Sequence, residues 1–149
     1  MNADDRQAIL DLIAQYGYTY DTNDVEGFLA LFHDDAVQSS YVAGQTAPLI
    51  TRRSNSDRRA FMLGRRGALA QHGVQTHHYQ TNSVLTEVGE GHVCAQTMTF
   101  VTHQRPSEAT PQVVGTGIYR DEFRRSADGW KFSRREAYLD QRPREYKPT

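Results

Sequence analysis

Two long hairpins fill the second half of the chain, and they restrict the possible folds more than any other feature. The first joins His77–Val88 to His92–Gln104 through a Gly-Glu-Gly turn, and the second joins Val113–Arg125 to Trp130–Asp140 through a Ser-Ala-Asp-Gly turn. Turns of this composition between strand-like runs are strong hairpin signals. The sequence therefore predicts four long antiparallel strands in succession.

The first half has helical periodicity instead. A stripe of apolar residues at spacings of three and four predicts a helix from about Asp4 to Tyr20, and its members are Ile9, Leu12, Ile13, Tyr16 and Tyr20. A sheet that follows such a helix must bury one of its faces, and it can do so by curving around the helix.

Shorter elements lie between these two regions. Asn23 followed by Glu26 resembles a capping box and predicts a second, short helix. Ala36–Val42 is predicted as a short strand, and Ser56 or Asp57 is expected to cap a third helix. The predicted fold is therefore α+β, with N-terminal helices packed against a curved, mostly antiparallel sheet.

Composition narrows the class of protein. A chain of 149 residues with a net charge of -1 suits a single domain (1–149), with a loose tail at 142–149, and gives no reason to expect nucleic acid or an anionic membrane as a partner. The acidic start is unlike a secretory signal, and no apolar run approaches the roughly 20 residues of a membrane span. A single cysteine, Cys94, fits a reducing compartment and is expected to be a small buried residue. These features predict a soluble, cytoplasmic domain.

His78 is the strongest candidate for chemistry, and Asp21 at the end of the first predicted helix is its candidate partner. A carboxylate that holds an imidazole by one ring nitrogen leaves the other nitrogen basic, which suits a general base near neutral pH. The sequence alone does not place the two residues together. The alternative is a structural histidine and an ordinary helix-end carboxylate.

Four strings resemble the SnoaL-like branch of the nuclear-transport-factor-2-like superfamily. Tyr20–Phe32 is similar to its first helix, turn and second helix, and Thr76–Asn82 is similar to the strand that carries the catalytic histidine of its dehydratases and dehydrochlorinases. Gly117–Arg135 resembles the final hairpin of its hexachlorocyclohexane dehydrochlorinases, and Val101–Arg105 the second-histidine region of its scytalone dehydratases. The resemblance covers nearly the whole chain.

This resemblance implies a cone-shaped α+β barrel with an internal pocket and cofactor-independent chemistry. It implies that His78 removes a proton from carbon while Asp21 orients its ring. Members of the fold usually associate through the outer face of the sheet, so a homo-oligomer (dimer or trimer) is expected. The fold also hosts isomerases, cyclases and binding proteins, so membership alone does not define the reaction.

Three more residues are candidates for catalysis, each with a structural alternative. Tyr16 matches a polar pocket position of the bile-acid dehydratases and could stabilise an enolate, or it could be a core residue. His103 could protonate a departing hydroxyl, or lie on the surface at a strand end. Arg135 matches a functional arginine of the dehydrochlorinases and could bind a leaving group or an anion, or be one of many solvated arginines.

Tyr20, Tyr41 and Tyr119 are expected to line the cavity and bind substrate, whereas His77 alternates to the opposite face and is interpreted as structural. The stretch Arg52–Arg66 holds six arginines and could guide an anionic substrate or form an oligomer contact, although a solvated helix face is the favoured interpretation. The histidine spacing does not favour a metal site.

The sequence and the resemblance together lead to one functional prediction. The chain is predicted to be a cofactor-independent lyase, a dehydratase, that acts on a small cyclic or polycyclic hydroxy-carbonyl compound. One alternative keeps the same base in an isomerase or cyclase. Another is a small-ligand-binding module without catalytic power.

Overall fold

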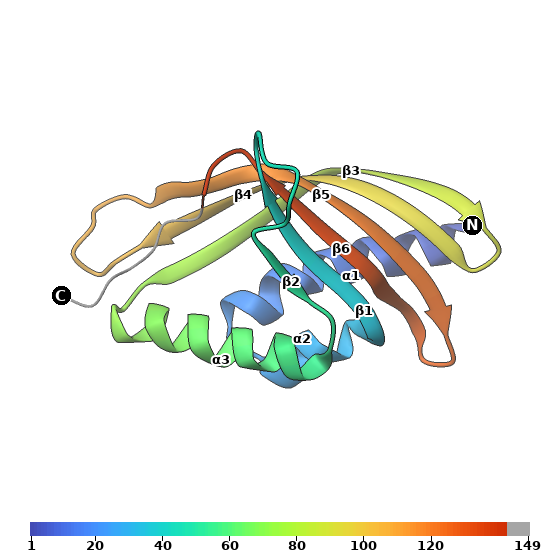
Figure 1. Cartoon of the computed structure of the whole chain (residues 1–149), viewed down its shortest axis with the longest axis horizontal. Coiled ribbons are helices and arrows are strands. Elements are labelled where there is room, and N and C mark those ends of the chain that lie inside the picture. The colour runs from blue at the N-terminus through green and yellow to red at the C-terminus, as the bar shows by residue number, and fades with distance from the viewer. Residues whose placement is uncertain (143–149) are drawn as a thin grey trace.

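A curved sheet covers one side of three helices in the computed structural model, which describes residues 1–142 and, within them, all side chains except those of Arg66 and Ala70 (Figure 1). The helices are α1 (Ala3–Asp21), α2 (Val25–Ala30) and α3 (Asn55–Gln71). The strands are β1 (Phe32–Val42), β2 (Ile50–Arg52), β3 (Gln75–Gly89), β4 (His92–Gln104), β5 (Gln112–Ser126) and β6 (Gly129–Leu139). The tail predicted at 142–149 lies outside the described residues from 143 onward.

The six strands form one sheet in the order β2-β1-β6-β5-β4-β3. The two predicted hairpins, β3–β4 and β5–β6, are present, with turns in which Gly91 (φ +64°) and Gly129 (φ +107°) adopt backbone conformations that favour glycine. Strand β1 pairs in parallel with β6, and all the other pairings are antiparallel. The α+β prediction is confirmed.

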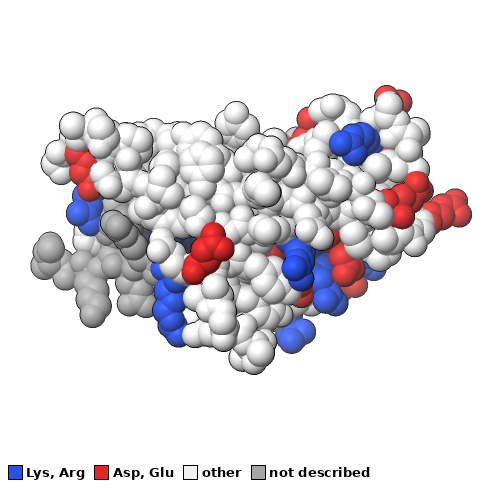
Figure 2. Space-filling view, turned by 90° about the horizontal axis from the view of Figure 1, so that it is seen from above, with Lys and Arg blue, Asp and Glu red and all other residues white. Residues whose placement is uncertain are grey.

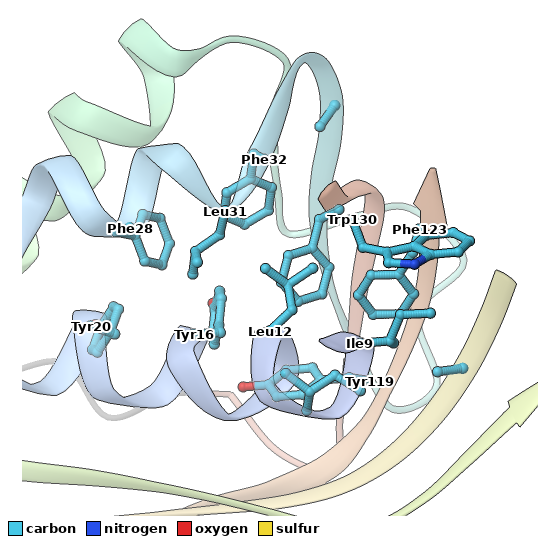
Figure 3. Packing of buried hydrophobic residues seen from close by; sticks show 14 of the residues in the cluster. Ile9, Leu12, Tyr16, Tyr20, Phe28, Leu31, Phe32, Tyr119, Phe123 and Trp130 are labelled. Carbon is cyan, nitrogen blue, oxygen red and sulfur yellow. The ribbon is translucent and has the colours of Figure 1, made fainter. Parts of the chain in front are cut away.

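Helix α1 lies along the concave side of the sheet, and its apolar stripe forms the centre of the core. Figure 3 shows Tyr16 and Tyr20 on successive turns of α1, facing Phe28 of α2. Phe32 at the start of β1 stacks on Phe132 of β6 at 5.2 Å between ring centroids. Aromatic rings of this size bury large apolar areas, so the core closes at one end and leaves space at the other.

Four local predictions need correction. Strand β1 begins at Phe32 rather than Ala36, because residues 32–35 are already part of the strand. The cap of α2 is Asp24, whose carboxylate accepts from the Gly27 N–H at 2.9 Å, while the preceding residue has φ +60°. Helix α3 is capped by Ser54, whose hydroxyl accepts from the Asp57 N–H at 3.1 Å. Cys94 is half-buried rather than buried, because it lies on the outer face of β4.

The arginine-rich stretch is also different from its favoured interpretation as a solvated helix face. Arg58 is fully buried, and its guanidinium donates to the Ala36 carbonyl at 2.8 Å and the His33 carbonyl at 3.2 Å. Arg52 is 7 % exposed. Among the described side chains of α3, the exposed Arg59, which pairs with Glu26, behaves like a solvated helix residue. Arginine can be buried in this way because hydrogen bonds and aromatic rings replace its water.

Candidate active site

Asp21, the last residue of α1, contacts His78 of β3 through both of its carboxylate oxygens. Its Oδ1 lies 2.7 Å from the ring Nδ1 of His78, and its Oδ2 accepts from the His78 backbone N–H at 2.7 Å. The Asp21 side chain is only 12 % exposed, and the His78 side chain is only 10 % exposed. Because Nδ1 faces the carboxylate, Nε2 is the ring nitrogen left for the cavity. This geometry suits an imidazole that carries its proton on Nδ1 and is basic at Nε2.

A glycine allows the helix to approach the strand closely enough for this contact. A Cβ atom on Gly17 of α1 would lie 3.2 Å from the His78 carbonyl oxygen and 3.3 Å from the His78 Cβ. These distances are shorter than ordinary van der Waals contact, so a larger residue would push α1 away from β3. Gly17 therefore helps to position Asp21 against His78.

His78 opens into a cavity of about 310 Å³ between the helices and the concave face of the sheet. This volume is near the lower end of the range of about 300–1,000 Å³ that is typical of small-molecule sites. The described residues that line it come from α1, α3 and all the strands, and include Tyr16, Tyr20, Gln38, Arg52, Phe61, Arg65, His78, His103, Tyr119 and Arg135. Six of the eight predicted site residues therefore line one space.

Tyr16 places a phenol in this cavity. Its Oη accepts from Nε2 of Gln38 at 3.1 Å, and complete burial raises the pKa of Tyr16, an effect that the nearby Arg135 partly offsets. The phenol is therefore protonated at neutral pH and can donate its own hydrogen to an oxygen of a ligand. A donor held in this way can stabilise negative charge that develops on a carbonyl oxygen.

Arg135 lies at the base of the cavity between two tyrosine rings. Its guanidinium carbon is 3.8 Å from the ring centroids of both Tyr16 and Tyr119, and it is 1 % exposed. Nη2 donates to the side-chain Oε1 of Gln80, and Nε lies 3.7 Å from Oδ1 of Asp121. Nη1 has no hydrogen-bond partner among the described residues. Arg135 is therefore a fixed cation in the wall of the cavity.

Asp121 pairs with this arginine under strong desolvation. Burial raises the pKa of Asp121 from 3.8 to about 6, and the positive charge of Arg135 opposes the rise. Because its pKa is higher in the folded protein than in the unfolded chain, the folded state holds the proton more tightly. The contribution of protonated Asp121 to the free energy of unfolding is therefore present below about pH 4 and is lost as pH rises towards about 6.

The Asp121→Asn variant tests this dependence. We expect the free energy of unfolding of the wild type, relative to that of Asp121→Asn, to fall as pH rises from 3.8 to about 6, by on the order of 1–3 kcal/mol. Urea denaturation of both proteins at the two pH values measures it. A difference that stays constant or rises would show that burial does not hold the proton on Asp121.

His103 is buried on the inner face of β4, at 3 % exposure, and lines the same cavity. The interpretation as a surface histidine is therefore wrong. In the pairing of β3 with β4, His78 is opposite Val101, so His103 lies diagonally across from His78. Residues in such diagonal positions are roughly 7–8 Å apart. A substrate placed between the two rings could contact both.

The three tyrosines expected to bind substrate do not lie together. Tyr20 and Tyr119 line the cavity, and burial raises the pKa of Tyr20 to about 12. Tyr41 is not among the described cavity residues, and its ring stacks on that of Tyr138 at 4.9 Å. Tyr41 on β1 pairs with Tyr138 on β6, and Tyr138 pairs in turn with the exposed Ile118 on β5. Because paired residues point to the same face of a sheet, Tyr41 lies on the outer face. The prediction for Tyr41 is wrong.

Sequence reasoning did not single out Gln38, Gln80 and Asp121, which support Tyr16 and Arg135. Strand alternation could have found two of them. Gln80 is two residues after His78, and Asp121 lies between the inward-facing Tyr119 and Phe123, so both occupy inward positions. Polar residues at inward positions of a strand are a signal of a functional cavity.

Two further properties concern the part of the chain that the structure describes. Within residues 1–142, no group of three or more His, Cys, Asp or Glu side chains lies close enough together to hold a metal ion. None of the described helices is both long enough and apolar enough to span a membrane.

The fold is shared with several solved structures. One is the β subunit of a proposed aromatic-ring-hydroxylating dioxygenase from Novosphingobium aromaticivorans, with 23% identity, a TM-score of 0.77, and coverage of 91% of this chain and 89% of that one. Another is a proposed scytalone dehydratase from the same organism, with 22% identity, a TM-score of 0.75 and coverage of 95% and 89%. These likenesses show the fold.

A third solved structure with this fold is an NTF2-like protein with a cystatin-like fold from Novosphingobium aromaticivorans. It is 28% identical, with a TM-score of 0.74 and coverage of 91% of this chain and 82% of that one. A search of curated protein sequences gave no significant match. The model of the SnoaL-like domain matches residues 1–136. Because that match takes in most of the chain, and the NTF2-like fold agrees with it, the chain belongs to the SnoaL-like family, as its sequence motifs predicted.

Proposed function

We propose that this protein is a cofactor-independent lyase that dehydrates a small cyclic hydroxy-carbonyl compound. The observation that carries the proposal is the contact between Asp21 and His78, because it holds an imidazole with one nitrogen open to a ligand-sized cavity. The SnoaL-like family contains dehydratases and polyketide cyclases, so this chemistry lies within its range. The cavity volume of about 310 Å³ favours a compound of one or two rings over a steroid-sized one.

The first step is removal of a proton from the carbon next to the carbonyl group. Nε2 of His78 takes the proton, and the electron pair of the C–H bond moves into the carbonyl to form an enolate. The carboxylate of Asp21 stabilises the imidazolium that results, because it accepts the hydrogen on Nδ1.

The enolate oxygen needs donors, and the cavity offers two. The protonated phenol of Tyr16 and the guanidinium of Arg135 both belong to residues that line the cavity. Fixed donors in a site that excludes water stabilise such an oxyanion more strongly than water does.

The second step is loss of the hydroxyl group from the next carbon. The enolate pair forms the new C=C bond as the C–O bond breaks, and the hydroxyl leaves as water with a proton from His103. His78 then returns its proton to solvent and His103 recovers one, so the net reaction converts the hydroxy-carbonyl compound into the unsaturated carbonyl compound and water.

A substrate screen tests this function. Cyclic β-hydroxy ketones with one or two rings are incubated with the protein, and the masses of the products are measured by mass spectrometry. The proposal expects a product lighter than the substrate by one water molecule. A rearranged product of unchanged mass would instead identify an isomerase or cyclase that uses the same base. Tight binding of a compound that is never converted would identify a binding module.

We also propose that the protein is a homo-oligomer that associates through the outer face of its sheet. Figure 2 shows the molecule from above, where large areas carry no Lys, Arg, Asp or Glu, while Arg120, Glu122, Arg134 and Glu136 form a charged cluster on the outer side of β5 and β6. Paired outer positions carry Tyr79 opposite Phe100, and Met98 opposite Ile118, all of them partly or largely exposed. A contiguous apolar surface of this kind marks an interaction site.

Sedimentation tests the association. We expect the wild type to sediment as a dimer or trimer, and Met98→Lys, which places a charge in the centre of the outer face, to shift it towards the monomer. Glu90→Lys, in an exposed hairpin turn, serves as the control and should not change the sedimentation. A monomeric wild type would contradict the proposal.

A further inference from the structure

The cavity is lined by cations and by no carboxylate. Among the described residues in its wall are Arg52, Arg65, Arg135 and Arg142, and none is an aspartate or glutamate. The chain as a whole is slightly acidic, with 18 Asp and Glu against 17 Lys and Arg. Positive charge is therefore concentrated in the one space that holds His78, and such a space favours anionic ligands.

Arg52 is the more unusual of these arginines because it is buried without a counter-ion. It is 7 % exposed, its guanidinium carbon lies 3.6 Å from the ring centroid of Phe61, and no described carboxylate is within ion-pair distance of it. Burial lowers the pKa of Arg52, which reflects the cost of holding its charge away from water. A buried cation usually has a paired anion.

Arg65 faces the same part of the cavity from α3. Its Nε donates to Oη of Tyr20 at 2.6 Å, and it too has no carboxylate partner among the described residues. Its charge is close enough to Arg52 to contribute to the lowered pKa of that residue. Two like charges held side by side repel each other, and an anion between them removes the repulsion.

Two other arginines of the same stretch have hydrogen-bond or ion-pair partners within the protein. Arg58 uses its donors on the Ala36 and His33 carbonyls and on the side chain of Asn55. Arg59 pairs with Glu26. Those two arginines have structural partners, whereas Arg52 and Arg65 keep donors for the cavity.

We propose that Arg52 and Arg65 bind a carboxylate of the substrate. This inference rests on the proposed function, since it assigns the substrate class for the same cavity. The planar guanidinium matches a carboxylate through paired hydrogen bonds, and aromatic rings beside both arginines suit a flat ligand. Tyr20 contacts both the candidate base and the arginine pair. Its ring centroid is 4.6 Å from that of His78, and its hydroxyl accepts a hydrogen bond from Nε of Arg65.

This placement defines the substrate further. The carboxylate binds on the α3 side, and the reacting carbon lies about one ring away at His78, with the carbonyl oxygen directed to Tyr16 and Arg135. The substrate class is therefore a cyclic hydroxy-carbonyl acid of one or two rings.

Binding of unreactive probes tests the charge preference apart from catalysis. Calorimetry compares 2-naphthoate with the uncharged 2-naphthamide, and we expect the wild type to bind the carboxylate roughly 10–100-fold more tightly. Arg65→Gln and Arg52→Met should each remove most of that preference. Arg59→Gln, an exposed arginine that pairs with Glu26, is the matched control and should retain it. Arg65 is only half-buried, so its variant remains informative if Arg52→Met does not fold.

Three results would overturn the inference: equal binding of the two probes by the wild type, an unchanged preference in Arg65→Gln, or tighter binding of 2-naphthyl phosphate than of 2-naphthoate, which would assign the site to a phosphate. The same titrations on His78→Ala separate this inference from the lyase. A preserved preference in a protein that never dehydrates any compound would leave the carboxylate site standing while the proposed function fails.

Discussion

Replacement of His78 by alanine is expected to reduce kcat by roughly 10²–10⁴-fold, with little effect on folding. The loss is large because His78 combines a carboxylate-bound imidazole with a position on the cavity. The fold survives because β3 remains paired with β4 along its length. The measurement is kcat and KM on the compound identified by the dehydration screen, together with the midpoint of thermal unfolding.

His77→Ala is the matched control for this variant. His77 is the preceding residue on the same strand, but it is exposed, so its loss should leave kcat near the wild-type value. If His78→Ala retained wild-type turnover, or if both variants lost activity equally, the assignment of His78 as the base would be wrong. A loss of activity that accompanies unfolding would be detected by the thermal midpoint.

Replacement of Arg58 by alanine is expected to destabilise the protein by about 2–4 kcal/mol. Arg58 is fully buried and joins α3 to β1, because it donates to the carbonyls of Ala36 and His33 and its guanidinium lies 4.7 Å from the ring centroid of Phe32. Truncation would leave buried carbonyl oxygens without donors and a cavity beside an aromatic ring. Urea denaturation measures the free energy of unfolding.

Arg59→Ala controls for the loss of a positive charge from the same helix. Arg59 is exposed and pairs with Glu26 on the surface, where an ion pair contributes little. It should therefore leave the unfolding transition close to that of the wild type. Equal stability of the Arg58 and Arg59 variants would contradict the structural role of Arg58.

Local signals predicted the helices and hairpins well, and long-range contacts account for the errors. The hairpins of β3–β4 and β5–β6 depend on turn residues that are adjacent in sequence. Strand β1 pairs in parallel with β6, almost a hundred residues away, so the polar residues at its start gave no local sign that they belong to a strand. A parallel partner of this kind has no sequence signature nearby.

The predictions for the candidate site also differ between those that the sequence supported and those that depended on long-range contacts. The partnership of Asp21 with His78 followed from the family resemblance, and the structure places the two side chains in contact. Tyr41 was assigned to the wrong face, because a difference of one residue in strand register reverses the direction of a side chain. The burial of Arg52 depends on Phe61 of another element, which composition does not reveal.

The tautomer of His78, read by nitrogen NMR of the ring, tests the central claim most directly. In the neutral ring we expect the His78 proton on Nδ1, against Asp21. In Asp21→Asn the amide oxygen can accept from the backbone N–H of His78, which turns the amide NH₂ towards Nδ1 and moves the ring proton to Nε2. A wild-type ring protonated on Nε2, or a tautomer that does not change in Asp21→Asn, would contradict the role of His78 as a base oriented by Asp21.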